Sequence, residues 1–211
     1  MWLIPVVVLV LGWFAFGMIF NLRRGDALLR WLQSGLPQIG ERTTFRWLGT
    51  SVVELVINQA KKPFRRVETL IVLVPRDIPW MWLMASLQGR RDTLVFRANL
   101  TTSLRVDLEL ADPSSWTGRI ALTQTAQRGW EGQPYDSLRL SAPRGTVAAA
   151  TTTLAELSGP MQKLALHYWR FSLRREPPHL EVHIAIPDRR SDAAQFVGAF
   201  LELARAVSER A

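Results

Sequence analysis

The chain has 211 residues, no cysteine and a formal net charge of +8, from 26 Lys and Arg against 18 Asp and Glu. The lack of cysteine excludes lipoprotein processing, which acylates a cysteine, but it leaves both oxidising and reducing compartments open. The basic balance predicts affinity for anionic surfaces, and a lipid leaflet is one such surface.

An uncharged apolar segment begins the chain. Residues 2–20 contain no charge and no amide side chain, and as a helix they would extend about 28 Å. This length matches the hydrocarbon core of a bilayer, about 30 Å. A cleaved signal peptide needs a basic start, a shorter apolar run and a small-x-small cleavage site, and the segment has none of these. We therefore expect a single-pass signal-anchor, with residues 1–22 as the transmembrane anchor and residues 23–211 as one soluble domain.

The basic residues next to this segment predict its orientation. No Lys or Arg precedes it, whereas Arg23, Arg24 and Arg30 follow it closely. Positive charge near a membrane span favours the cytoplasmic side. We therefore expect the soluble domain to face the cytoplasm.

The remaining segments alternate between helix and strand periods. In chain order we expect a helix at 26–34, strands at 43–58 and 64–74, a helix at 79–88, and strands at 93–100 and 105–111. Two shorter strands, near 119–125 and 137–142, would lie among the loops of 112–145. The last third reads as helix 147–162, strand 164–174, strand 179–186 and helix 191–209. The predicted fold class is α+β, a mainly antiparallel sheet with helices on one face.

The order helix, strand, strand, helix occurs twice. It occurs first over 26–88 and again over 147–209, and in both copies a strand leads to a proline before the closing helix, at Pro75 and Pro187. This raises the hypothesis of a degenerate internal duplication, which residue identity alone does not support.

The motif His179-x-Glu181-x-His183 has the residue types of a metal site but not the spacing. On a strand the two histidines would stand about 13 Å apart, too far for one zinc ion. If Arg174 pairs across the turn with His179, the same face carries Arg170, and a Glu–Arg ladder results. We therefore expect a solvated polar face, with no metal and no cofactor.

The other face of this hairpin should belong to the core. It would carry His167, Trp169, Phe171 and Leu173 on the first strand, opposite the apolar residues of 180–186. His167 has no nucleophile pattern near it, so we expect a hydrogen-bonded core histidine and not a catalytic base.

The segment 78–91 is the strongest candidate for an interaction surface. Trp80 and Trp82 are two residues apart and would point to different sides of a helix, so at least one should be exposed. Arg90 and Arg91 follow closely, and aromatic and arginine side chains are enriched at interfaces and headgroup layers. The alternative is that this helix belongs to the core.

No motif in the sequence identifies a reaction. Gly-rich phosphate loops, a nucleophile elbow and paired Cys/His sites are missing, and the arginine pairs are scattered and do not form a nucleic-acid-binding stripe. We therefore expect a membrane-anchored accessory or interaction subunit that docks to a membrane complex or an anionic leaflet. The alternative is a membrane-tethered enzyme whose site is assembled from distant residues. Nucleic-acid binding ranks third, and the catalytic residues and any small-molecule ligand are unknown.

Overall fold

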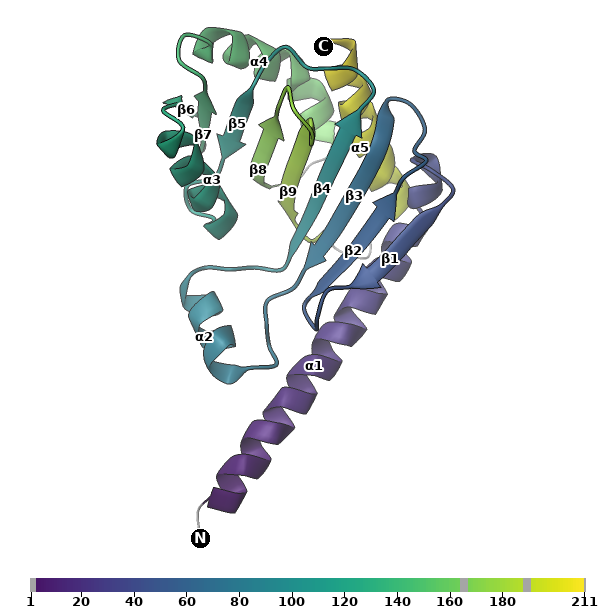
Figure 1. Cartoon of the computed structure of the whole chain (residues 1–211), viewed down its shortest axis with the longest axis vertical. Helices are drawn as coiled ribbons and strands as arrows, with labels where there is room; N and C mark the ends of the chain where they lie inside the picture. Colours follow the sequence, from purple (N-terminus) through teal and green to yellow (C-terminus); the bar gives the residue numbers. More distant parts are fainter. Residues whose placement is uncertain (1–2, 164–166, 188–190, 211) are drawn as a thin grey trace.

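The computed structural model describes residues 3–163, 167–187 and 191–210. A long amino-terminal helix leads into an α+β domain built on one antiparallel sheet (Figure 1), which confirms the predicted fold class. In the described residues the sheet has nine strands in the order β1-β2-β3-β4-β9-β8-β5-β7-β6. These strands are β1 (Thr43–Trp47), β2 (Val52–Ile57), β3 (Phe64–Val72), β4 (Thr93–Leu100), β5 (Leu108–Ala111), β6 (Glu131–Tyr135), β7 (Leu138–Ala142), β8 (Tyr168–Leu173) and β9 (Leu180–Ala185).

The helices lie on both sides of this sheet and below it. They are α1 (Leu3–Gln33), α2 (Pro79–Leu87), α3 (Trp116–Gln127), α4 (Val147–Lys163) and α5 (Ala193–Glu209), with a short 3-10 helix η1 (Leu36–Gln38). The carboxy-terminal part of α1 packs with α4 and α5 against one face, called here the helix-covered face. The opposite face, called the open face, carries α3, which lies over β5, β7 and β8. In Figure 1, α2 lies apart from the sheet, beside α1.

Helix α1 contains the candidate membrane span. By length and composition, Ile4–Gln33 is the helix of the described chain that is long and apolar enough to cross a membrane. Trp2, where the predicted segment begins, lies outside the described residues. The separate helix predicted at 26–34 is wrong, because no proline or cap interrupts the chain there and α1 continues through it. Its apolar stripe was correctly placed, since Leu28, Leu29 and Leu32 are buried in the core.

The core lies between the helix-covered face and the helices. Phe96 of β4 and Phe64 of β3 both stack on Phe200 of α5, with ring centroids 4.5 and 5.8 Å apart. Helix α5 begins at Asp192, whose side chain accepts a hydrogen bond from the backbone N–H of Ala194. Aromatic burial of this extent contributes several kcal/mol to folding, on the order of 2–3 kcal/mol per side chain.

The structure refines two of the predicted strands. The segment 43–58 is a hairpin and not one strand, because the chain turns at Gly49, whose φ of +76° suits glycine. The strand predicted at 64–74 is β3, and its apolar residues on the helix-covered face, Val67 and Ile71, are buried. On the open face, however, Leu70 and Val72 are only half-buried.

One of the strands predicted within 112–145 is a helix in the structure. Residues 119–125 belong to α3 and not to a strand, because Ser115 caps a helix by accepting a hydrogen bond from the N–H of Gly118. The strand at 137–142 is confirmed as β7. Strand β6 was missed because Pro134 argues against a strand, yet β6 is at the edge of the sheet, where proline is tolerated.

The carboxy-terminal hairpin has the predicted register over most of its length. Ser172 pairs with Glu181 and Arg170 with His183, and the N–H of Arg174 donates to the carbonyl of His179. Residues 164–166, where the first strand was predicted to begin, lie outside the described residues. The first copy of the repeated element order forms the three-stranded β1-β2-β3 meander and the second a two-stranded hairpin, so a duplication stays a hypothesis.

Candidate functional site

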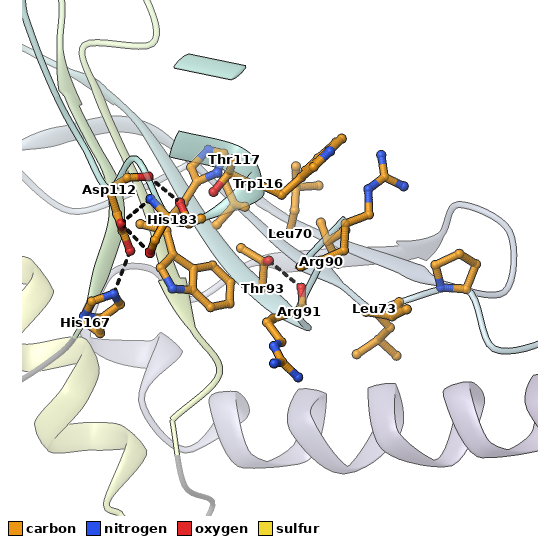
Figure 2. Close-up of a pocket in the computed structure, with 18 of the residues that line it drawn as sticks. Leu70, Leu73, Arg90, Arg91, Thr93, Asp112, Trp116, Thr117, His167 and His183 are labelled. Atoms are coloured by element: carbon orange, nitrogen blue, oxygen red, sulfur yellow. Dashed lines mark hydrogen bonds and ion pairs between the residues drawn. The ribbon is translucent and has the colours of Figure 1, made fainter. Parts of the chain in front are cut away.

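The open face contains a cavity, called here the sheet cavity, of about 570 Å³. Its floor is formed by apolar side chains of β3 and β4, among them Leu70, Val72 and Val95. Its wall is the start of α3, at Trp116 and Thr117 (Figure 2). This volume lies within the range of about 300–1,000 Å³ that is typical of small-molecule sites, so the half-buried residues of β3 line a usable cavity.

Arginine side chains form the side of the sheet cavity that leads toward α2. The guanidinium of Arg90 stacks on the indole of Trp116, 3.7 Å from the ring centroid. Arg91 lines the same cavity. Among the described residues neither arginine has a carboxylate partner within ion-pair distance. The charge of half-buried Arg90 is therefore uncompensated beside an apolar space, where charge interactions are stronger than in water, and exposed Arg91 adds a second positive charge at the rim.

Three polar atoms in the cavity wall are buried without a hydrogen-bond partner in the described part of the chain. They are Nε of Arg90, Oγ1 of Thr117 and Nδ1 of His183. His183 is 8% exposed, and its other nitrogen, Nε2, is held by Oε1 of Glu181 at 2.7 Å. A buried polar atom without a partner costs about 1–3 kcal/mol, so three of them around one cavity are a notable feature.

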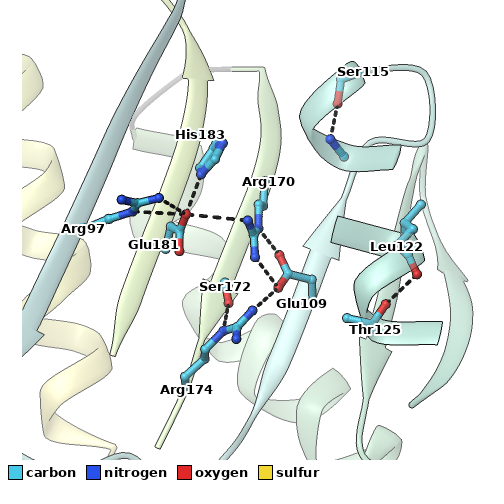
Figure 3. A network of polar contacts seen from close by, with 11 residues as sticks. Arg97, Glu109, Ser115, Leu122, Thr125, Arg170, Ser172, Arg174, Glu181 and His183 are labelled. Atoms are coloured by element: carbon cyan, nitrogen blue, oxygen red, sulfur yellow. Dashed lines mark hydrogen bonds and ion pairs between the residues drawn. The ribbon is translucent and has the colours of Figure 1, made fainter. Parts of the chain in front are cut away.

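Beyond His183 the open face carries a network of arginine and glutamate side chains (Figure 3). Arg170 donates two hydrogen bonds to Glu109, of 2.6 and 3.1 Å, and Arg174 donates a third of 3.1 Å to the same carboxylate. Glu181 lies 3.6 Å from Arg170 and 3.4 Å from Arg97. Each buried carboxylate therefore faces at least two arginines.

This network corrects the prediction of a solvated face. His179, Glu181 and His183 are all buried, although the ladder pairing was predicted correctly. Burial alone would raise the pKa of Glu181, but the hydrogen bond from His183 and the charges of Arg170 and Arg97 outweigh it and lower the pKa to about 2. Nδ1 of His179 accepts a hydrogen bond from the N–H of Leu100, so this ring has a structural role.

The prediction that His167 and Trp169 belong to the core is wrong. The register shifts between Tyr168 and Arg170, so Tyr168 takes the core position opposite Ile184. His167 and Trp169 consequently line the sheet cavity. A bulge of this kind reverses the faces of the residues before it, and a sequence pattern of period two does not reveal it.

His167 pairs with Asp112 at the rim of the sheet cavity. Nε2 of His167 lies 2.9 Å from Oδ2 of Asp112, and the histidine side chain is 61% exposed. Burial opposes the charge of Asp112, but hydrogen bonds from Ser114 and His167 outweigh it and lower its pKa. The pair therefore combines an ionised carboxylate with an accessible imidazole, as an acid–base site requires.

Of the four predicted interaction residues, the structure brings Trp82, Arg90 and Arg91 together around one cavity, whereas Trp80 does not line it. Trp80 and Trp82 lie on α2 and are 61% and 37% exposed, so the alternative that α2 is a core helix is wrong. Arg90 and Arg91 also line the sheet cavity. Helix α2 also exposes Met81, Leu83, Met84 and Leu87, so its apolar side chains point to all sides.

The apolar half of α1 holds α2 and the loop before it. The indole N–H of Trp13 donates to the carbonyl of Arg76 at 3.0 Å, and the rings of Trp13 and Trp82 are 5.9 Å apart. A Cβ at Gly17 would come within 2.1 Å of the same carbonyl oxygen, so glycine is required for this close approach. The contact fixes α2 beside the candidate span.

Polar side chains, called here the polar collar, surround α1 where its apolar segment ends. Asp92 accepts from Arg76 at 3.0 and 3.1 Å and lies 2.6 Å from Arg24. Asn21, fully buried, donates to the carbonyl of Val74 and accepts from Arg76. A second cavity of about 450 Å³ adjoins this collar and shares Arg90 and Arg91 with the sheet cavity.

Sequence reasoning found the arginines of this site but missed Trp116, Thr117 and His183 as cavity residues. Because the sequence pattern predicts a strand at 119–125, it predicts no helix on the open face. The same pattern places His183 in a solvated ladder and not in a cavity wall. The signal that could have placed α3 is Ser115, which precedes Trp116-Thr117-Gly118 as a helix cap.

No protein-family model matches the chain, and no curated protein is significantly similar to it. Within the described ranges no group of three or more His, Cys, Asp or Glu side chains is arranged to hold a metal ion. The features that bear on function are therefore the geometry of α1, α2 and the sheet cavity.

Proposed function

We propose that the protein is a membrane-anchored accessory subunit whose helix α2 docks into the leaflet next to its own span. The observation that supports this most directly is the exposure of apolar side chains all around α2. A helix that is apolar on every side requires an apolar environment, either a protein core or lipid. Leu87 is 79% exposed, so it belongs to no core of the described chain.

The position of α2 along α1 is consistent with burial in the hydrocarbon of one leaflet. If the polar collar at Asn21 marks the headgroup boundary, Trp13 lies about 12 Å deeper, at a rise of about 1.5 Å per residue. Trp82 contacts Trp13, so α2 occupies this depth. Interfacial helices are buried by about 5–10 Å, so α2, at about 12 Å, would lie slightly deeper than such a helix and still within one leaflet of about 15 Å.

The charges around the polar collar support an anionic leaflet as the surface. Arg24, Arg76, Arg90 and Arg91 line the second cavity, and among the described residues of that wall Asp92 is the acidic one. Basic residues close to a membrane surface each contribute about 1 kcal/mol of attraction to anionic lipid. Together with the positive-inside preference, these charges support a cytoplasmic position of the domain, because anionic lipid is enriched in the cytoplasmic leaflet.

Single-cysteine variants test this proposal, because the chain has no cysteine of its own. Met84→Cys and Leu87→Cys, spin-labelled in nanodiscs of phosphatidylcholine and phosphatidylserine, should be accessible to oxygen and shielded from a water-soluble nickel relaxant. Thr123→Cys on α3 is the matched control and should report water. Equal access of the nickel reagent to all three sites would refute leaflet docking.

The orientation has its own test. Ser208→Cys near the carboxy terminus should stay unlabelled by a membrane-impermeant maleimide in intact cells and react after the cells are lysed. Labelling in intact cells would place the domain on the opposite side of the membrane. If the α2 labels are shielded from the nickel reagent only when another membrane protein is co-purified, α2 docks to a protein partner and not to lipid.

A second candidate function is a membrane-tethered enzyme that acts in the sheet cavity. It is favoured by the His167–Asp112 pair, an imidazole beside an ionised carboxylate at the cavity rim. Such a pair can move a proton to or from a bound molecule. Turnover of a cavity ligand that is lost in His167→Gln, with binding retained, would favour this function over accessory docking.

A further inference from the structure

We propose that the sheet cavity binds an anionic amphiphile with a single apolar chain. The inference rests in part on the proposed docking of α2, because that docking brings the cavity to the bilayer surface. It adds a ligand site on the open face to a protein whose other features concern anchoring.

The wall of the cavity selects for a negative charge. Arg90 and Arg91 have no carboxylate partner among the described residues, whereas the other charges of the wall, Arg97 and Asp112, are already paired. Stacking on Trp116 holds the Arg90 guanidinium in place and leaves its Nε without a partner. A phosphate or carboxylate group would accept from such a guanidinium in its preferred geometry.

Thr117 and His183 add hydrogen-bonding positions to this charge. Both have a buried polar atom without a partner in the described chain, and both line the same cavity as Arg90 (Figure 2). Nε2 of His183 is fixed by Glu181, so Nδ1 accepts from a hydroxyl while the ring is neutral and donates to an anionic oxygen once it is protonated. A ligand oxygen at this point would satisfy atoms that otherwise cost stability.

The rest of the cavity selects for an apolar body. Leu70 and Val72 form an apolar strip along β3, and Leu73, Val74 and Pro75 continue it beyond the strand toward the polar collar and α2. Arg90 and Arg91 lie between this strip and the second cavity. An apolar chain on the strip with its charged group at Arg90 satisfies both the apolar and the cationic part of the wall.

The test uses the full chain in phosphatidylcholine nanodiscs with a photoactivatable dodecyl phosphate. We expect labelling of peptides from β3, β4 or α3, and competition by unlabelled dodecyl phosphate. Dodecyl trimethylammonium, with the same chain and the opposite charge, should compete at least tenfold less well, and inorganic phosphate should not compete. Equal competition by the cationic amphiphile, or full competition by inorganic phosphate, would overturn the proposed ligand class.

Matched substitutions locate the site. Arg90→Gln and Thr117→Val should each reduce competed labelling about tenfold, the usual effect of losing a hydrogen bond to a charged group. The control variants Arg128→Gln and Thr123→Val make the same changes at exposed positions in or directly after α3. They should leave the competed labelling unchanged. Thr117→Val should not lower the melting temperature, since its hydroxyl has no partner to lose. A lower melting temperature in Thr117→Val would indicate a structural role and contradict the proposal.

The two proposals fail separately. If the cysteine labels on α2 report water while competed labelling of the cavity persists, leaflet docking is wrong and the ligand enters from solution. If α2 is shielded but no competed labelling appears, the cavity proposal alone is wrong. Leu70→Trp, which fills the cavity, should abolish labelling without changing the shielding of α2.

Discussion

The two faces of the sheet are made by alternate residues of the same strands, yet they are buried in different ways. On the helix-covered face Phe96 and Phe171 meet apolar side chains of the helices and neighbouring strands. On the open face Arg170 and Glu109 are also buried, but as an ion pair. A sheet face without a full helix layer can therefore still be closed by paired charges, provided that every charge has a partner.

The cavity lies where this pairing ends. Across one row of the open face Glu68, Arg97 and Glu181 face one another in register. In the next row Leu70, Val95 and His183 follow, and the row offers His183 no partner at Nδ1. An apolar strip therefore adjoins a network that leaves one polar atom unsatisfied, and this junction provides the ligand chemistry proposed above.

The largest expected effect is on the helix-covered face. Phe171→Ala should lower the free energy of unfolding by about 3–5 kcal/mol, because the ring is fully buried and its loss leaves a cavity. Its neighbour Ser172 points to the open face and accepts from Nε of Arg174, so Ser172→Ala should cost at most about 1.5 kcal/mol. Urea denaturation of the full chain in nanodiscs measures both, and equal losses would mean that the assigned faces are wrong.

The next effect tests the charge pairs of the open face. Glu109→Ala should cost about 3 kcal/mol, because Arg170 and Arg174 would keep buried charges without their carboxylate. The double variant Glu109→Ala with Arg170→Met should recover a large part of that loss, since it removes the unpaired charge. If the double variant were no more stable than Glu109→Ala, uncompensated charge would not be the cause of the loss.

These two faces also show what the sequence could and could not reveal. Alternation along 170–174 and 180–184 predicted which residues face each other, because a strand has a fixed period of two. It could not reveal that Glu181 is buried, since that depends on Arg97 of a strand distant in sequence. The Trp169 bulge and the cap at Ser115 decide where His167 and Trp116 lie, and both are single-residue features inside otherwise regular patterns.

The third effect is the pH dependence of the open face. The pKa of Glu181 is lowered from its ordinary value of 4.5 to about 2 in the folded state. Its contribution to stability is therefore fully present above about pH 4.5 and is lost as the pH falls toward 2. We expect this contribution to be on the order of 3 kcal/mol, because the two pKa values differ by about two and a half and each tenfold difference in proton affinity between the folded and unfolded states corresponds to about 1.4 kcal/mol.

Chemical denaturation at a series of pH values, with Glu181→Gln as the control, isolates the contribution of this carboxylate. The difference in the free energy of unfolding between the two proteins should shrink steadily below pH 4.5. Protonation of Asp112 lowers the stability of both proteins equally and does not affect this difference. A constant difference over that range would mean that Glu181 is not held ionised by its arginines.

The smallest effect comes from an ion pair of the same chemistry outside the sheet. Nε of Arg210 lies 2.9 Å from Oε2 of Glu156, between α5 and α4, and both side chains are well exposed. Water screens this pair, and fixing two long side chains costs entropy, so Arg210→Gln should change the free energy of unfolding by less than about 1 kcal/mol. The distance alone resembles that of the Arg170–Glu109 pair, at 2.6 Å. A loss as large as that of Glu109→Ala would show that distance and not burial determines the strength of these pairs, and the contrast between the two faces would no longer hold.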